Sequence, residues 1–211
     1  MVIYPKHRWH RYHMDILRRV GKRPGILAAY RSLAKGRVGE SIGRRYLSVL
    51  YSRGGIKVMI EKPILIKDGH ERVPDCVIFY GKWYCPMIVE IKFGRIHEET
   101  VRATVEKYSG GYLHLPEDVW FSIKHMSWRT RRCIRRRIVP VGIIMISIQG
   151  EHTEEFREEM FLRYGVILLD RKHLFRTIRG IRDMNKYIRS ALIQNIDQIA
   201  TRLEKKYGGK R

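Results

Sequence analysis

Two carboxylates and one lysine stand in neighbouring apolar runs of the sequence, at spacings that suit chemistry on a phosphate group. Asp75 follows Pro74 in one run, and Glu90 and Lys92 belong to a Glu-Ile-Lys triplet in the next. Because side chains alternate along a strand, Glu90 and Lys92 share a face, and the two carboxylates converge if the strands pair. Two carboxylates on rigid strands are hard-oxygen ligands suited to Mg²⁺. Glu40, in a preceding helical pattern, is the candidate third carboxylate.

The lysine of this set has two interpretations. Beside a bound cation, Lys92 would orient a water molecule or balance charge near a scissile phosphate. Alternatively, Glu90 and Lys92 form a solvated salt bridge on an exposed strand face, and a second Glu-x-Lys triplet at 204–206 shows that the pattern is common. Apolar runs flank the Glu90 strand, which predicts a central position, and a charge buried there needs a partner or a role.

The elements that must position these residues follow from the pattern of apolar side chains. Helical spacing predicts a helix over 31–50 and a C-terminal amphipathic helix over 181–203. Turns are expected at Asp68-Gly69 and Gly81, and Pro63 predicts an edge position or a bulge. The other predicted elements are strands Lys57–Ile66, Arg72–Tyr80, Met87–Phe93, Val139–Ile148 and Val166–Leu169, and helices Glu98–Leu113 and Thr153–Tyr164. This order predicts an α/β fold with a mixed central sheet flanked by helices.

The content, order and approximate spacing of the motifs resemble the PD-(D/E)XK nuclease superfamily. The resemblance covers residues from about 31 to 150 and implies a restriction-endonuclease-like αβββαβ core. It rests on the joint order of three short motifs, because each motif alone is weak. In chain order these are Gly36-Arg37-Val38-Gly39-Glu40-Ser41, Pro74-Asp75 and Glu90-Ile91-Lys92.

That resemblance assigns a role to each motif residue. It implies that Asp75 and Glu90 are metal ligands, that Ile91 lends a backbone carbonyl, and that Glu40 is the carboxylate of the first helix. It implies that Lys92 is the catalytic lysine. The implied cofactor is Mg²⁺ or Mn²⁺, with no small-molecule cofactor.

Within the superfamily, the chain is particularly similar to small archaeal Holliday junction resolvases and to nuclease-like proteins of archaeal spindle-shaped viruses. This similarity implies a DNA endonuclease acting on branched DNA such as Holliday junctions, and a homodimer. We expect a basic N-terminal arm at 1–30, a nuclease-like core at 31–180 with a basic insert at 124–137, and a C-terminal helix and tail at 181–211. The apolar stripe of the C-terminal segment, from Ile181 to Leu203, either packs on the core or forms the dimer seam.

The charge balance indicates a polyanionic partner. Forty-three Lys and Arg residues against 21 Asp and Glu residues give a formal net charge of +22. Nucleic acid is the expected partner, and an anionic membrane surface is the alternative. No apolar run reaches the roughly 18 residues of a membrane span, and no signal-peptide pattern is present. Three cysteines without a C-x-x-C pair suit a reducing compartment, so we expect a cytoplasmic protein, in the host of an archaeal virus if the resemblance holds.

Two basic segments are the candidate DNA contacts. The insert contains no acid between Ile123 and Glu151, whereas a solvated helix face normally mixes charges of both signs. The arm also carries His7, His10 and His13, which are a weak zinc candidate or extra basic and stacking groups. The predicted DNA-binding residues are Lys124, Arg129, Arg131, Arg132, Arg135, Arg136 and Arg137 of the insert, with Arg8 and Arg11 of the arm.

Three functions remain open at this point. A metal-dependent DNA endonuclease is favoured because Asp75, Glu90 and Lys92 are all present. A non-catalytic DNA-binding or architectural protein on the same fold is the alternative from another class. An RNA nuclease or tRNA-splicing-like protein shares the basic surface, but it would use a set of His, Tyr and Lys side chains for acid–base chemistry instead of carboxylates that hold a metal.

Overall fold

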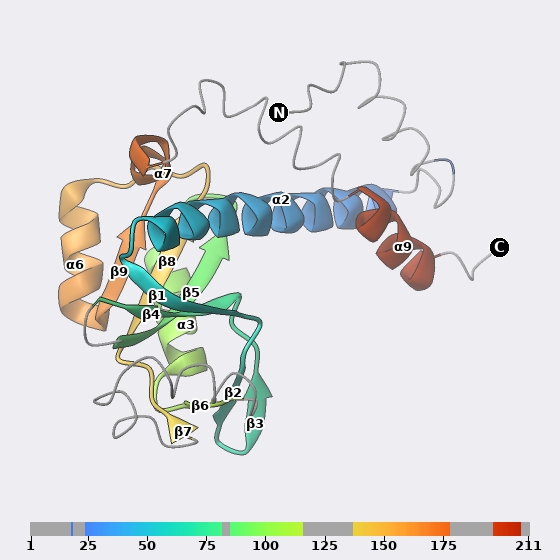
Figure 1. Cartoon of the computed structure of the whole chain (residues 1–211). Helices are drawn as coiled ribbons and strands as arrows, with labels where there is room; N and C mark the ends of the chain where they lie inside the picture. Colours follow the sequence, from blue (N-terminus) through green and yellow to red (C-terminus); the bar gives the residue numbers. More distant parts are fainter. Residues whose placement is uncertain (1–17, 19–23, 82–84, 116–136, 178–195, 208–211) are drawn as a thin grey trace. The chain divides into compact units, whose positions relative to one another are not determined.

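The computed structural model describes residue 18 and residues 24–81, 85–115, 137–177 and 196–207 (Figure 1). The chain divides into two compact units, Met1–Ile42 with Arg179–Arg211, and Gly43–Ile178. Helix α2, Pro24–Ser52, contributes to both. This helix begins at Pro24 and ends at Ser52, so the predicted helix over 31–50 was too short. Proline has no backbone N–H and a fixed φ, both of which suit the first turn of a helix.

The first unit pairs the beginning of α2 with α9, Ile196–Tyr207. Tyr30 and Ala34 of α2 form one buried cluster with Ile199, Ala200 and Leu203 of α9. Ile199 and Leu203 belong to the apolar stripe predicted from the sequence, and they are occupied by packing within the chain. The other stripe residues Ile181, Met184, Ile188 and Leu192 lie outside the described residues.

The second unit is built on a mixed sheet of five strands. The strands are β1 (Ile56–Glu61), β4 (Cys76–Tyr80), β5 (Cys85–Lys92), β8 (Gly142–Ser147) and β9 (Val166–Leu169). Their order is β1-β4-β5-β8-β9, antiparallel from β1 to β5 and parallel from β5 to β9. The central place of β5 confirms the prediction for the strand that carries Glu90.

A second sheet, which the sequence did not predict, has the order β3-β2-β6-β7. Its strands are β2 (Ile64–Lys67), β3 (His70–Arg72), β6 (Tyr112–His114) and β7 (Arg137–Ile138). The predicted strand Val139–Ile148 was too long, because β8 covers only Gly142–Ser147. Strands β2, β3 and β6 occupy parts of the predicted strands Lys57–Ile66 and Arg72–Tyr80 and of the predicted helix Glu98–Leu113, which were each too long. The first of these breaks at Lys62, where a φ of 48° interrupts the strand before Pro63.

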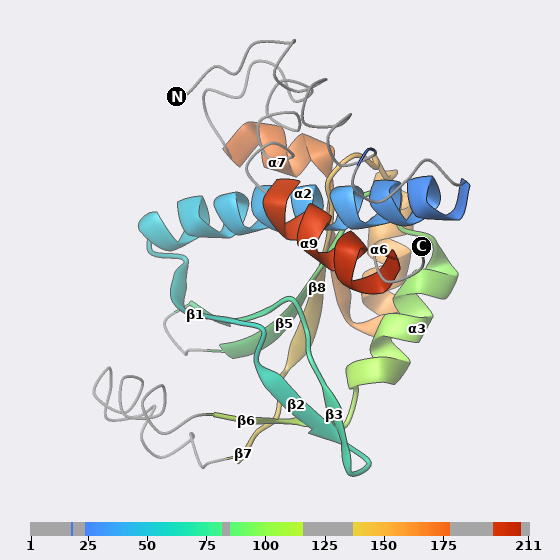
Figure 2. The ribbon, with the colours of Figure 1, turned by 90° about the vertical axis from the view of Figure 1, so that its right-hand side faces the viewer.

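Short turns of the expected kind join the strands of this region. Asp68 and Gly69 have φ of 51° and 73° and connect β2 to β3, whose Lys67 and His70 pair (Figure 2). Positive φ at both positions is typical of a tight two-residue hairpin turn, which favours Asp-Gly. The turn was correctly predicted, but it joins two strands of the second sheet.

Three helices belong to the second unit beyond α2. They are α3 (Glu98–Tyr108), α6 (Glu154–Tyr164) and α7 (Arg171–Thr177). Thr153 caps α6, because its hydroxyl accepts a bond of 3.2 Å from the Phe156 amide. After α3 the chain passes close to β2: a Cβ atom on Gly111 would lie 2.3 Å from Leu65 Cδ2.

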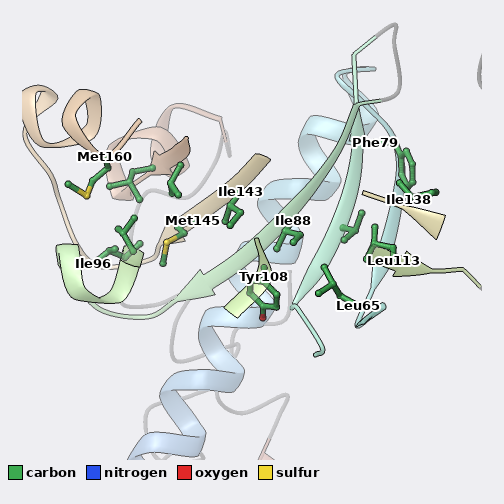
Figure 3. Close-up of a cluster of buried hydrophobic side chains, with 14 of the residues drawn as sticks. Leu65, Phe79, Ile88, Ile96, Tyr108, Leu113, Ile138, Ile143, Met145 and Met160 are labelled. Carbon is green, nitrogen blue, oxygen red and sulfur yellow. The ribbon is translucent and has the colours of Figure 1, made fainter. Parts of the chain in front are cut away.

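One hydrophobic core joins the two sheets to α3 and α6 (Figure 3). Val77, Phe79 and Ile88 of the large sheet share it with Leu65 of β2 and Met160 of α6. The opposite face of the large sheet meets the end of α2, where a Cβ atom on Gly43 would lie 2.5 Å from Ile91 Cδ1. The face that carries Glu90 is therefore the face that α3 covers.

Among the described helices, none is long and apolar enough to cross a membrane.

A buried polar cluster ties β9 to α6 and α7. Asp170, which is fully buried, accepts bonds from Arg157 Nη1 at 3.0 Å and His173 Nδ1 at 2.9 Å, and from the His152 amide at 3.2 Å. The His152 ring is also buried, and its Nε2 lies 3.0 Å from the carbonyl oxygen of Ile96. Burial lowers the pKa of His152, because the charged imidazolium loses hydration there.

Because the pKa of His152 is lowered in the folded protein, we predict that the protein loses stability in mild acid. The folded protein takes up the His152 proton only at a pH below the ordinary pKa of about 6.5, whereas the unfolded chain takes it up near 6.5. The unfolded state therefore gains protons first, and the free energy of unfolding falls as pH drops from 7.5 to 5.5. Urea unfolding should show a weaker fall for His152→Gln. The exposed His114→Gln control should keep the wild-type pH dependence, and an equal dependence in all three proteins would contradict the assignment.

Candidate active site

The two carboxylates predicted from the sequence meet at the junction of β4 and β5. Cys76 pairs with Val89 in the antiparallel register. Continued one residue past the start of β4, this register places Asp75 opposite Glu90. Asp75 lies just before β4, and its Oδ2 accepts a bond of 2.7 Å from the Ile91 amide. The backbone of β5 therefore fixes the side chain of Asp75 next to the Glu-Ile-Lys triplet.

Glu90 is a buried carboxylate that three side chains surround. It is only 4% exposed. Its Oε2 accepts a bond of 2.9 Å from Lys92 Nζ, and its Oε1 accepts a short bond from the Tyr108 hydroxyl. Lys107 Nζ lies 3.9 Å from the same Oε1. A solvated salt bridge of Glu90 and Lys92 is thus excluded, because the carboxylate is enclosed in protein and needs these donors to offset lost hydration.

Lys92 reaches from this enclosed carboxylate toward solvent. Its side chain is 38% exposed, against 6% for the side chain of Glu90. The alternation of β5 places both on the face covered by α3, while the Ile91 side chain packs against Gly43 on the other face. An ammonium that touches both Glu90 and solvent is placed to meet an anionic group that approaches from outside.

Tyr108 and Lys107 of α3 are site residues that the sequence did not single out. Tyr108 is 1% exposed, and its ring packs in the core shown in Figure 3. Burial, followed by the charge of Glu90 and the hydrogen bond to it, raises the pKa of the Tyr108 hydroxyl well above its ordinary value. The hydroxyl therefore stays protonated and donates to Glu90. Lys107 is held nearby, with its Nζ 4.6 Å from the centre of the Tyr108 ring.

Tyr108→Phe should destabilise the folded protein, because Glu90 Oε1 then loses a buried donor. Bonds to charged groups contribute about 1.5–3 kcal/mol, so the free energy of unfolding in urea should fall by that amount. Tyr164→Phe is the matched control, since Tyr164 bonds Glu98 Oε1 at 2.7 Å in a half-exposed place. Its loss should stay under about 1 kcal/mol. Equal losses for the two variants would contradict the buried bond to Glu90.

Glu40, the predicted third carboxylate, lies on α2 within the first unit. Its Oε2 is 3.4 Å from Arg37 Nη1, and its side chain is 27% exposed. The second unit by itself thus brings together Asp75, Glu90, Ile91 and Lys92, which are four of the five residues of the predicted catalytic and metal-binding set.

The donors at this junction fit a hard divalent cation. Asp75 and Glu90 supply carboxylate oxygens, and Mg²⁺ in proteins takes one or two carboxylates with water and substrate phosphate completing its coordination. Within the described residues, no group of three or more His, Cys, Asp and Glu side chains gathers as a metal site.

Of the predicted DNA-binding residues, the structure places one. Arg137 lies in β7, opposite His114 of β6. Residues Lys124, Arg129, Arg131, Arg132, Arg135 and Arg136 of the basic insert, Arg8 and Arg11 of the arm, and His7, His10 and His13 lie outside the described residues.

Comparison with models of known families, with curated proteins and with solved structures gives no match to this chain. The function is therefore inferred from the residues of the site and from the charge of the chain.

Proposed function

We propose that the protein is a metal-dependent DNA endonuclease that hydrolyses phosphodiester bonds at the junction of β4 and β5. The observation that carries the proposal is the placement of Asp75, buried Glu90 and Lys92 around the end of β5. Asp75 is tied to β5 through the Ile91 amide, and Glu90 is buried beside Lys92. Burying a carboxylate in a central strand costs stability, and a role in catalysis accounts for its presence.

The strand order supports a restriction-endonuclease-like core for this site. Along the chain, helix α2 precedes β1, β4 and β5, and helix α3 and the parallel strand β8 follow. This is the αβββαβ order that the resemblance to PD-(D/E)XK nucleases implies. Strand β9, helices α6 and α7 and the whole second sheet are additions to that order.

Each residue of the site has a role in the proposed reaction. The carboxylates of Asp75 and Glu90 would hold Mg²⁺ or Mn²⁺, and the resemblance adds the Ile91 carbonyl and Glu40. The bound cation supplies Lewis acidity, which stabilises charge developing on a phosphodiester. The ammonium of Lys92 offsets further negative charge and orients the attacking water molecule. Tyr108 and Lys107 hold the carboxylate of Glu90 in place.

DNA is the proposed substrate because of the charge of the whole chain. The formal net charge of +22 favours a polyanion, and each phosphate contact releases counterions and so strengthens binding at low salt. We further propose a homodimer acting on branched DNA, since a symmetric protein suits a symmetric junction. Ile199 and Leu203, two residues of the stripe proposed as the dimer seam, pack within the first unit.

Incubation with a set of DNA forms tests the proposal. Linear duplex, nicked duplex, flap and four-way-junction DNA are each incubated with purified protein and with Mg²⁺, Mn²⁺ or EDTA. The proposal expects cleavage of at least one form with a metal and none with EDTA. Binding without cleavage of any form would favour the non-catalytic DNA-binding protein. That alternative agrees with the bonds that Glu90 already makes to Lys92 and Tyr108.

A further inference from the structure

A hollow of about 430 Å³ lies between the β2–β3 hairpin and α3. Lys67, Asp68 and Arg72 line it from the hairpin, and Ala103, Glu106 and Lys107 line it from the helix. These residues carry three positive and two negative charges, which leaves one positive charge. A phosphodiester group carries one negative charge, so the hollow matches a single backbone phosphate.

The hollow adjoins the carboxylate of the candidate active site. Lys107 lines the hollow, and its Nζ is 3.9 Å from Glu90 Oε1. Arg72 also lies near this point. Its charge partly offsets the rise in the pKa of Tyr108 that burial and Glu90 cause. A nucleic acid strand with one phosphate held by a cation at Asp75 and Glu90 would therefore have Lys107 and Arg72 near a neighbouring phosphate.

The frame around the hollow is fixed by packing and pairing. Arg72 of β3 pairs with Leu65 of β2, and Leu65 is fully buried in the core. Lys67 Nζ donates a short bond to the Glu106 carbonyl oxygen and so ties the hairpin to α3. Among the described residues, no carboxylate lies within ion-pair distance of Arg72. Within the described part of the chain, the exposed guanidinium of Arg72 therefore lines the hollow without a carboxylate partner.

We propose that Arg72 and Lys107 bind a backbone phosphate of the DNA strand next to the bond that is cut. This inference rests on the proposed nuclease function and adds a substrate contact outside the Asp75–Glu90–Lys92 site. Guanidinium and ammonium groups on a rigid frame suit a phosphate oxygen, because they make charge-assisted bonds at little ordering cost. The contact would fix the register of the strand on the enzyme without reading its sequence.

The test measures DNA binding in EDTA, where no cleavage takes place. A fluorescein-labelled DNA duplex is titrated with wild-type protein, with Arg72→Gln and with Arg72→Gln/Lys107→Gln, and anisotropy is followed over a range of salt concentrations. Loss of one charge-assisted contact should weaken binding roughly tenfold at low salt. The slope of log K against log salt should fall by about 0.9 for each phosphate contact removed.

Arg102→Gln is the matched control. Arg102 is an exposed cation of the same helix, but its charge acts on Tyr164, on the side of α3 that meets α6. Affinity and salt slope that change in the hollow variants and not in Arg102→Gln would support the proposal. Equal changes in all variants, or none in the hollow variants, would overturn it.

The proposed phosphate contact and the proposed hydrolysis can be disproved independently of each other. Arg72→Gln leaves Lys107, the neighbour of Glu90, in place. A loss of DNA affinity in that variant therefore does not result from a disturbed Glu90. If the wild type binds DNA with the expected difference between variants but cuts no DNA form, the hydrolysis fails and the phosphate contact stands. If the wild type binds no DNA, both proposals fall.

Discussion

Asp75→Asn and Glu90→Gln should each abolish DNA cleavage while leaving the affinity for DNA nearly unchanged. Both substitutions keep the size of the side chain and remove the negative charge that a divalent cation requires. Binding should survive because the charge that attracts DNA is spread over the whole chain, at a formal +22. Single-turnover cleavage of labelled DNA and anisotropy in EDTA measure the two quantities on the same protein.

The matched control for these variants is Glu99→Gln. Glu99 is an exposed carboxylate in the first turn of α3, away from the β4–β5 junction. It should cleave at the wild-type rate, because its loss changes the net charge by the same amount and leaves the site intact. Cleavage by Glu90→Gln at the rate of this control would show that the buried carboxylate takes no part in the reaction.

Lys92→Ala should slow cleavage by about 10²–10³-fold, the scale on which loss of one preorganised charge-stabilising group acts. Lys92 Nζ lies 2.9 Å from Glu90 Oε2 and reaches solvent, so its ammonium can meet both the carboxylate and the phosphate. The loss should appear in kcat more than in KM, because a charge that forms in the transition state is affected more than ground-state binding. Single-turnover rates over a range of DNA concentrations separate the two.

A structural role for Lys92 would give another result. Lys172→Ala removes an exposed lysine that lies 3.9 Å from Glu151, and it should cleave at the wild-type rate. If Lys92→Ala lowers the melting temperature but cuts as fast as Lys172→Ala, the lysine only balances the charge of Glu90. Thermal melting of both variants, measured beside the cleavage rates, decides between these roles.

The central part of the site could be predicted because it depends on local periodicity. Alternation along β5 places Glu90 and Lys92 on one face whatever surrounds the strand. The apolar runs on either side of β5 also predicted its central position. Asp75 required one further assumption, pairing of β4 with β5, and the structure bears it out, with the two strands antiparallel.

The second sheet and its side of the site could not be predicted in this way. Strands β3, β6 and β7 have two or three residues each, too few to show any alternation. The bond from Tyr108 to Glu90 joins residues 18 positions apart on different elements, and no spacing rule connects them. Gly111 is the local sequence signal of the chain's approach to the second sheet, because its closeness to Leu65 of β2 requires a glycine after the helix. The sequence shows two glycines there, but not the strand that follows.

The dependence of cleavage on Mg²⁺ tests the central claim most directly. Single-turnover cleavage of the preferred DNA form is measured for wild type and Glu90→Gln at increasing Mg²⁺, with an EDTA reference. We expect that wild-type cleavage rises with Mg²⁺ to a plateau and vanishes in EDTA, and that Glu90→Gln cleaves DNA at no Mg²⁺ concentration. Cleavage that persists in EDTA, equal rates for the two proteins, or no cleavage by the wild type at any Mg²⁺ concentration would contradict it.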